Sequence, residues 1–309
     1  MRSALAAALA LPAVLALACA PRAAGEGTPR ALEVEAGGAR FRILHGPEDA
    51  GAARQVARAL ARAAPRAQRF APLAAPVTIA IHPSHAALER AVGRPGYGWL
   101  RAWARRTAVD LQSPRTFGPL GGLLGARDAA VEELLAHELV HCAMYQRLGG
   151  ETTWMRPELP RWFSEGLASV AAGQGHRRGT RAELAALLRE QAAAPAGARE
   201  RPAAPPPGGA SGDPLAAHDA LYRDRAERVY ALGHHAVAFL LARHGDAAAV
   251  RVLDGLAAGL PFAAAFEAGT GLTPPAFAAA FLRDLDVSRP RPARAREDPR
   301  APGSARDGP

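Results

Sequence analysis

Residues 137–141 read His-Glu-Leu-Val-His, which places two imidazoles and a carboxylate in one short segment. If this segment is helical, His137 and His141 share one face, about 6 Å apart at Cβ, and both can bind one metal ion. Zn²⁺ accepts imidazole nitrogens at about 2.0–2.1 Å. Glu138 lies about 100° further round the helix, so it can reach a metal-bound water instead of the ion. The spacing predicts a zinc site with His137 and His141 as ligands and Glu138 as the general base.

The segment around these histidines is predicted to be a long buried helix, from Asp128 to Leu148, with Asp128 as its N-cap and Gly149 at its end. Apart from Glu138, the residues beside the histidines are uncharged, which is typical of a helix inside the core. Buried histidines and a buried carboxylate are costly unless they are paired or bound to a metal. The alternative is a core helix whose histidines are satisfied by hydrogen bonds alone.

A catalytic zinc site needs a third protein ligand and an open fourth position. The best candidate is Glu165, the carboxylate in the middle of the apolar segment Leu159–Ser169, 24 residues after His141. That separation leaves room for a loop and a returning helix. Gly166 has no side chain, so the two helices can approach closely. Glu158 is a weaker rival, because it precedes Pro160 and is expected in the loop.

These motifs resemble the gluzincin metallopeptidases, in particular the bacterial peptidase MA-like group. His137-Glu138-x-x-His141 is followed by Leu-Pro-Arg-Trp-Phe-Ser-Glu165-Gly-Leu-Ala, and the resemblance covers most of residues 77–286. It implies a zincin-like α+β fold with one Zn²⁺ ion, in which a small mixed sheet packs on the helix of the two histidines. It also implies that an edge strand, here residues 107–112, holds an extended substrate by adding it to the sheet.

The resemblance also implies the roles of further residues. Tyr230 would stabilise the oxyanion, with His234 and His235 as alternative donors. Some gluzincins place an acidic residue four positions after the third ligand, where it orients a zinc histidine. Ser169 stands at that position here, and its hydroxyl can accept the same bond more weakly. The implied reaction is hydrolysis of a peptide bond, in which Glu138 takes the proton of the attacking water.

Hydrophobic patterning predicts one domain over residues 31–286, with an α/β part (31–156) and an all-helical part (157–286). The expected strands are 31–36, 41–45, 77–82 and 107–112. The expected helices, besides the one of the histidines, are 50–64, 160–172, 181–191, 224–244, 246–258, 261–268 and 274–286. Three further histidines, His82, His85 and His218, are expected in surface loops. Residues 194–213 are predicted to be a flexible Pro/Gly/Ala loop.

The two ends of the chain have the composition of targeting and tail segments. Residues 1–19 are typical of an export signal, and Leu-Ala-Leu-Ala-Cys19 resembles a bacterial lipobox in which Cys19 is lipidated. Residues 20–30 are then a tether, and residues 287–309 a disordered Pro/Arg-rich tail. We therefore expect an exported protein of the bacterial cell envelope, either lipid-anchored or soluble. Cys142 is expected to be a buried free thiol.

The net charge of +9 does not predict a nucleic-acid partner. All 38 basic residues are arginines, and the tail from residue 288 holds six of them against three acids. No RNA-binding aromatic pattern, zinc-finger spacing or basic helix stripe is present in the sequence. The expected partner is a peptide or protein substrate, with membrane contact only through a lipid anchor; the sequence leaves the oligomeric state open.

Three functions fit these residues. The leading hypothesis is a zinc metallopeptidase. A catalytically weak or inactive envelope binding protein with the same fold is the alternative, because Ser169 replaces an acidic residue. A metal-dependent hydrolase of a non-peptide bond is the third.

Overall fold

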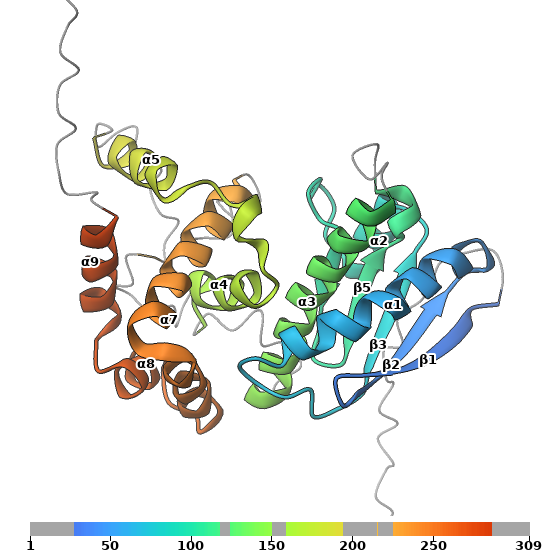
Figure 1. Cartoon of the computed structure of the whole chain (residues 1–309), viewed down its shortest axis with the longest axis horizontal. Helices are drawn as coiled ribbons and strands as arrows, with labels where there is room; N and C mark the ends of the chain where they lie inside the picture. Colours follow the sequence, from blue (N-terminus) through green and yellow to red (C-terminus); the bar gives the residue numbers. More distant parts are fainter. Residues whose placement is uncertain (1–27, 118–123, 150–158, 194–214, 216–224, 286–309) are drawn as a thin grey trace, which may run out of the picture.

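The computed structural model describes residues 28–117, 124–149, 159–193, 215 and 225–285. These residues form a five-stranded mixed sheet with its helices, followed by a helical half (Figure 1). The predicted α+β class and the order of its two parts are confirmed. Within these ranges, no helix combines the length and the apolar character that crossing a membrane requires. The predicted export signal, the loop 194–213, the tail, Cys19, Glu158 and His218 lie outside the described residues.

The helices and strands follow one another along the chain as follows. The strands are β1 (Arg30–Ala36), β2 (Ala39–His45), β3 (Val77–His82), β4 (Ala102–Ala104) and β5 (Ala108–Gln112). The helices are α1 (Ala50–Ala67), α2 (His85–Val92), α3 (Leu124–Leu148), α4 (Arg161–Ala171), α5 (Arg181–Ala193), α7 (Ala226–Ala257), α8 (Phe262–Thr270) and α9 (Pro274–Asp284). A short 3-10 helix, η5 (Gln174–Arg177), follows α4.

Several predicted boundaries differ from the observed ones. Helix α3 begins at Leu124, so Asp128 is not its N-cap; Asp128 lies inside the helix and accepts a hydrogen bond from Gln55 of α1 at 2.7 Å. Helix α1 continues two residues past Pro65, where the sequence predicts its end. The predicted break between residues 244 and 246 is confirmed, because Gly245 takes a non-helical conformation with φ of 70° inside α7.

The sheet has the strand order β1-β2-β3-β5-β4. Strands β2, β3 and β5 are parallel, and the two outer strands β1 and β4 are antiparallel to their neighbours. The expectation that residues 107–112 form the edge strand is wrong, because β5 pairs with β3 on one side and β4 on the other. The edge strand next to the helix of the two histidines is β4. With only three residues, Ala-Trp-Ala, it is too short for a strand pattern to predict.

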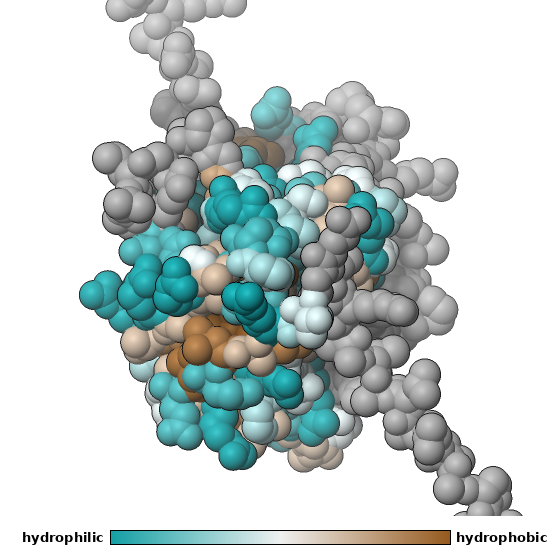
Figure 2. Space-filling model, turned by 90° about the vertical axis from the view of Figure 1, so that its right-hand side faces the viewer, coloured by the Kyte–Doolittle hydropathy of each residue, from teal (hydrophilic) through white to brown (hydrophobic). Residues whose placement is uncertain are grey.

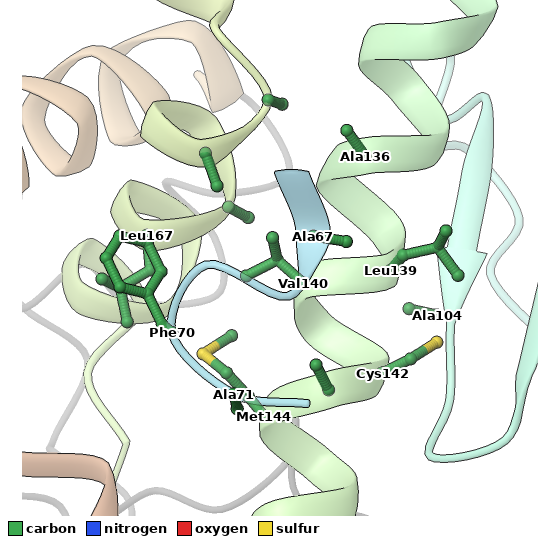
Figure 3. Close-up of a cluster of buried hydrophobic side chains, with 14 of the residues drawn as sticks. Ala67, Phe70, Ala71, Ala104, Ala136, Leu139, Val140, Cys142, Met144 and Leu167 are labelled. Atoms are coloured by element: carbon green, nitrogen blue, oxygen red, sulfur yellow. The ribbon is translucent and has the colours of Figure 1, made fainter. Parts of the chain in front are cut away.

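Two helices cover one face of this sheet. Helix α1 packs against β1 and β2, α3 packs against β4 and β5, and the two helices pack against each other (Figure 1). Helix α3 is also covered on its far side by α4, which makes it a buried helix as predicted. Figure 3 shows Leu139 and Cys142 directed to the side of Ala104 in β4, and Val140 and Met144 directed to the opposite side. His137, Glu138 and His141 of α3 therefore lie in a largely apolar interior.

The outer face of the β1–β2 hairpin is polar. Alternate residues of β2, Arg40 and Arg42, are exposed, and Arg42 forms a 3.5 Å ion pair with Glu33 of β1. Figure 2 views the molecule from this side and shows teal side chains around a small brown patch. The period-2 alternation of the hairpin thus directs its apolar residues toward α1 and its charged residues to solvent.

Helix α4 crosses helix α7 at two glycines. A Cβ atom on Gly166 would lie 2.3 Å from the carbonyl oxygen of Gly233, and a Cβ on Gly233 would lie 2.8 Å from the carbonyl oxygen of Trp162. The two backbones are therefore in direct contact, which confirms the close approach expected of Gly166. The crossing also brings the N-terminal turn of α7, with Tyr230, to the side of α3. Behind it lies a cluster of packed aromatic rings: Trp162, Phe163, Phe239, Phe262, Phe266, Phe277 and Phe281.

The substitution Gly166→Ala tests this crossing. The added methyl group overlaps the Gly233 carbonyl, so we expect a loss of about 1–3 kcal/mol in the free energy of unfolding, measured by urea denaturation. The matched control is Gly51→Ala, because a Cβ on Gly51 in α1 meets no atom within 4 Å. The control is expected to be unchanged or slightly more stable. Equal stability of Gly166→Ala and the wild type would contradict the close contact.

Candidate metal centre

Helices α3 and α4 bring three donor groups together. His137 Nε2 lies 3.3 Å from His141 Nε2, and the Glu165 Oε2 oxygen lies 3.1 Å from the first nitrogen and 3.4 Å from the second. The two histidines lie one turn apart on α3, and Glu165 faces them from the middle of α4. All three side chains are buried. The structure thus assembles all three residues that the sequence predicts as metal ligands.

This triangle of donor atoms fits a metal ion. In a tetrahedral site with bonds of about 2.0–2.1 Å, ligand atoms lie about 3.3–3.4 Å apart. The three observed separations of 3.1, 3.3 and 3.4 Å are close to that value. Within the described part of the chain, this is the group of three His, Cys, Asp or Glu residues that could hold an ion. Two imidazoles and one carboxylate could therefore bind a cation here.

The electrostatics of the triad favour a bound cation. Burial alone would raise the pKa of the Glu165 carboxyl, but the charge of His141 and hydrogen bonds from His137 and His141 hold that pKa well below its usual range. Burial lowers the pKa of His141, yet the charge of Glu165 and its hydrogen bond raise it overall. Glu165 is therefore ionised at neutral pH, as a metal ligand must be. Without a metal, the same attraction favours a proton on His141.

The orientation of His137 is fixed by Gln174, a residue that the sequence does not single out. The Oε1 oxygen of Gln174 accepts a hydrogen bond from His137 Nδ1 at 3.1 Å and a second one from Arg178 Nη2 at 2.6 Å. Because Arg178 can only donate, the oxygen of the amide must point at both groups. A neutral His137 that binds a metal through Nε2 would therefore carry its proton on Nδ1, with the lone pair of Nε2 directed at the centre of the triangle. The Nδ1 atom of His141 has no such partner among the described residues.

This contact corrects the expectation that Ser169 orients a metal-binding histidine. Ser169 is fully buried, but its hydroxyl lies 3.0 Å from His234 Nδ1 and accepts a hydrogen bond from Arg178 Nε at 3.2 Å. Burial, together with the charges of His235 and Arg178, lowers the pKa of His234 to about 4. His234 is therefore neutral at pH 7, and one hydrogen bond joins its Nδ1 atom to the Ser169 hydroxyl.

A cavity of about 420 Å³ opens onto the triad. Among the residues that line it are all three donors, Glu138, Tyr230, and Ala102 and Ala104 of the edge strand β4. His234 and His235 do not line it, and His235 donates from Nε2 to the carbonyl of Gly179 at 2.7 Å. Of the three predicted oxyanion donors, the structure places only Tyr230 at the cavity.

Glu138 lies beside the triad without being part of it. Burial raises the pKa of its carboxyl; the charges of His137 and His141 partly oppose this effect, and Glu165 adds to it. The backbone amide of Ala104, in the edge strand, lies close enough to this carboxylate to lower its pKa. The structure therefore provides a carboxylate with a raised pKa, next to the candidate metal and open to the same cavity. Such a group is suited to accept a proton from water and return it.

Tyr230 also lines the cavity, where it is held between three side chains. Its ring centroid lies 5.9 Å from that of His137 and 5.9 Å from that of Trp99, both in edge-to-face contacts. The guanidinium of Arg178 lies over the face of the Tyr230 ring, 4.7 Å from its centroid. These three contacts fix the position of Tyr230 directly beside His137, a candidate metal ligand.

The remaining histidines and the cysteine lie elsewhere. His82 is not a loop residue as expected: it is fully buried in β3, and its Nε2 lies 2.7 Å from Asp110 Oδ1. Asp110 is also paired with Arg105. His85 is the first residue of α2, 3.3 Å from Glu89. Cys142 is a buried free thiol, as predicted.

The substitutions Gln174→Ala and Ser169→Ala test which residue orients a metal-binding histidine: Gln174, as observed, or Ser169, as the sequence predicted. Removing Gln174 leaves His137 Nδ1 without its acceptor, so we expect zinc affinity to fall about 10–100-fold. Ser169→Ala is expected to change zinc affinity less than about threefold, because Ser169 contacts neither metal-binding histidine. Competition with a chromophoric chelator measures both constants. A larger effect of Ser169→Ala than of Gln174→Ala would contradict this assignment.

Comparison of the sequence with protein-family models gives no match, and comparison with curated proteins gives no significant one. The description of the site therefore depends on its own geometry. What that geometry establishes is a buried His137–His141–Glu165 triad, on a cavity, that could hold a metal ion.

Proposed function

We propose that this chain is a zinc-dependent peptidase of the gluzincin type, with a zincin-like fold, that hydrolyses peptide bonds. One observation carries the proposal: two histidines of one helix and a glutamate of the next helix converge on one point, while a separate carboxylate, Glu138, opens onto the same cavity. A purely structural triad would give no reason for Glu138 to be buried beside it, because a buried carboxylate is costly.

Zinc is the ion that the donor set favours. Two imidazole nitrogens and one carboxylate oxygen are the protein ligands of a known class of catalytic zinc sites, whereas Mg²⁺ and Ca²⁺ prefer oxygen ligands. His137, His141 and Glu165 would hold the ion. When bound, it would lower the pKa of water and polarise a carbonyl group.

The protein's own groups supply the proton transfers. Glu138 takes the proton of the attacking water and delivers it to the amine that leaves. Burial raises the pKa of its carboxyl, which makes it a better proton acceptor than an exposed glutamate. Tyr230, which also lines the cavity, donates a hydrogen bond from its hydroxyl to the oxygen on which negative charge develops.

The edge strand β4 favours a peptide as the substrate. Arg101 and Arg105 form backbone hydrogen bonds to β5, so the peptide groups of the alternate residues Ala102 and Ala104 point away from the sheet. Both of these residues line the cavity. An extended peptide can add to this edge as a further strand, which brings its backbone past Glu138. A hydrolase of a non-peptide bond would have no use for such an edge.

The alternative of an inactive binding protein loses part of its basis. It depends on the absence of an acidic residue at position 169, but Gln174 supplies the hydrogen bond that such a residue would give to a metal-binding histidine. We further propose that the peptidase is exported to the bacterial cell envelope, anchored by lipid at Cys19 or soluble. It would act on a peptide or protein, without a nucleic-acid partner and with no membrane contact apart from that anchor.

The substitution Glu138→Gln tests the central role. The amide keeps the size of the carboxylate and leaves the three donor groups in place, so zinc content should stay near one equivalent. Cleavage of a broad peptide library should fall by at least about 100-fold, since the general base is lost. Glu227→Gln, in another carboxylate that lines the cavity, serves as the control and is expected to retain cleavage. Undiminished cleavage by Glu138→Gln would exclude this mechanism.

The substitution Tyr230→Phe tests the oxyanion role. It removes only the hydroxyl and keeps the ring contacts with His137 and Trp99. We expect kcat to fall roughly 100–1000-fold, because the donor acts on charge that develops in the transition state. KM should change little, since the ground-state carbonyl gains less from this bond. Steady-state kinetics on one peptide measure both; an unchanged kcat would remove Tyr230 from the mechanism.

A further inference from the structure

Arg178 is a half-buried cation whose direct side-chain contacts among the described residues are all neutral, although burial lowers its pKa and the charges of Glu165 and Glu133 raise it from further away. Its contacts are the Gln174 amide oxygen at 2.6 Å, the Ser169 hydroxyl at 3.2 Å and the face of the Tyr230 ring. No carboxylate of the described residues forms an ion pair with it, although other arginines of the chain have one. A guanidinium removed from water without an anion is costly, and such an arrangement favours binding of an anion from outside.

The cavity that Arg178 lines is rich in positive charge. Four arginines (Arg101, Arg161, Arg177 and Arg178) and three glutamates line it. One of those glutamates is Glu165, whose charge a metal ion would take up. Arg177 is paired with Glu133, which does not line the cavity, at 2.5 Å. Once a divalent cation is bound, the cavity therefore carries an excess of positive charge that favours an anionic substrate.

The guanidinium of Arg178 is already positioned for recognition. Its Nε and Nη2 atoms donate to Ser169 and Gln174, and the Tyr230 ring supports its plane. The Nη1 atom has no acceptor among the described residues. A planar fork held in this way binds a carboxylate with directed, charge-assisted hydrogen bonds. The Gln174 oxygen alone separates Arg178 from the candidate metal ligand His137, so the anion would bind close to the reacting bond.

We propose that Arg178 binds a carboxylate of the substrate, so that the site selects peptides with a carboxylate near the cleaved bond. That carboxylate is either the C-terminus of the peptide or the side chain of an Asp or Glu residue. The inference rests on the proposed peptidase function for its catalytic consequence, but the binding of a carboxylate peptide does not require turnover.

The test uses three kinds of fluorescently labelled, N-acetylated hexapeptide that share one Ala/Gly/Ser sequence. The first peptide is amidated and uncharged, and the second has a free C-terminal carboxylate. The third is a series of amidated peptides, each of which carries a single Glu at one of the central positions. Their binding to the zinc-loaded full chain carrying Glu138→Gln is measured by fluorescence anisotropy. We expect one class of carboxylate peptide to bind at least about tenfold more tightly than the neutral peptide, with a preference that weakens as salt rises.

Three further variants, each made in the Glu138→Gln background, assign the preference to Arg178. Arg178→Gln should abolish it, and Arg178→Lys should reduce it, because an ammonium lacks the planar fork. Arg177→Gln, the matched control, should keep it, because Glu133 already neutralises Arg177. Zinc content and thermal melting of each variant verify that the site is intact. If Arg178→Gln does not fold, the comparison of Arg178→Lys with Arg177→Gln decides in the same way.

Two results would overturn the proposal: equal binding of all the peptides, or a preference that survives in Arg178→Gln, which would indicate that the metal or another arginine binds the carboxylate. Cleavage by the wild type is followed separately. A carboxylate preference without cleavage of any peptide would leave this inference standing and contradict the peptidase function. Cleavage of the peptides without a carboxylate preference would support the peptidase function and contradict the role of Arg178.

Discussion

The convergence of His137, His141 and Glu165 in an apolar interior is the constraint on which the rest of the structure depends. Two imidazoles and one carboxylate are withdrawn from water, and each is costly to bury alone. Their mutual separations of 3.1–3.4 Å bring the opposite charges into direct contact. The same separations suit a cation shared by all three groups. Helix α3 is buried on both of its sides, so these groups have no access to bulk water except through the cavity (Figure 3).

Two features of the packing make this convergence possible. The sheet and α1 hold α3 from one side, while α4 holds it from the other and carries Glu165. Helix α4 can pack closely on α7 because Gly166 and Gly233 allow the two backbones to touch. The same contact sets the position of Tyr230 on α7. The metal ligand on α4 and the candidate oxyanion donor on α7 are thus positioned by one helix crossing.

Around the triad, the polar side chains form one connected set. Gln174 joins the metal ligand His137 to Arg178, and Arg178 supports the ring of Tyr230. Glu138 lies beside the triad, near the backbone of Ala104 in the edge strand β4. The cavity therefore brings together a strand edge that can hold a peptide backbone, a carboxylate that can transfer a proton and arginines that can bind negative charge.

Local spacing in the sequence was sufficient to predict the helix of His137 and His141, because the i, i+4 relation fixes their geometry without any tertiary contact. Glu165 could be predicted from an isolated carboxylate in an apolar segment. Gln174 and Arg178 could not, because they follow α4 in and beside a 3-10 turn, where no periodicity connects them with His137. The wrong prediction that residues 107–112 form the edge strand has a similar origin. Strand order depends on pairing between distant segments, and a three-residue strand carries no pattern of its own.

The most direct test of the central claim is a crystal structure of the zinc-loaded protein with anomalous scattering measured at the zinc absorption edge. The account predicts an anomalous peak about 2.0–2.2 Å from the Nε2 atoms of His137 and His141 and from a carboxylate oxygen of Glu165. A peak at another place, or a Glu165 carboxylate turned away from the ion, would contradict it.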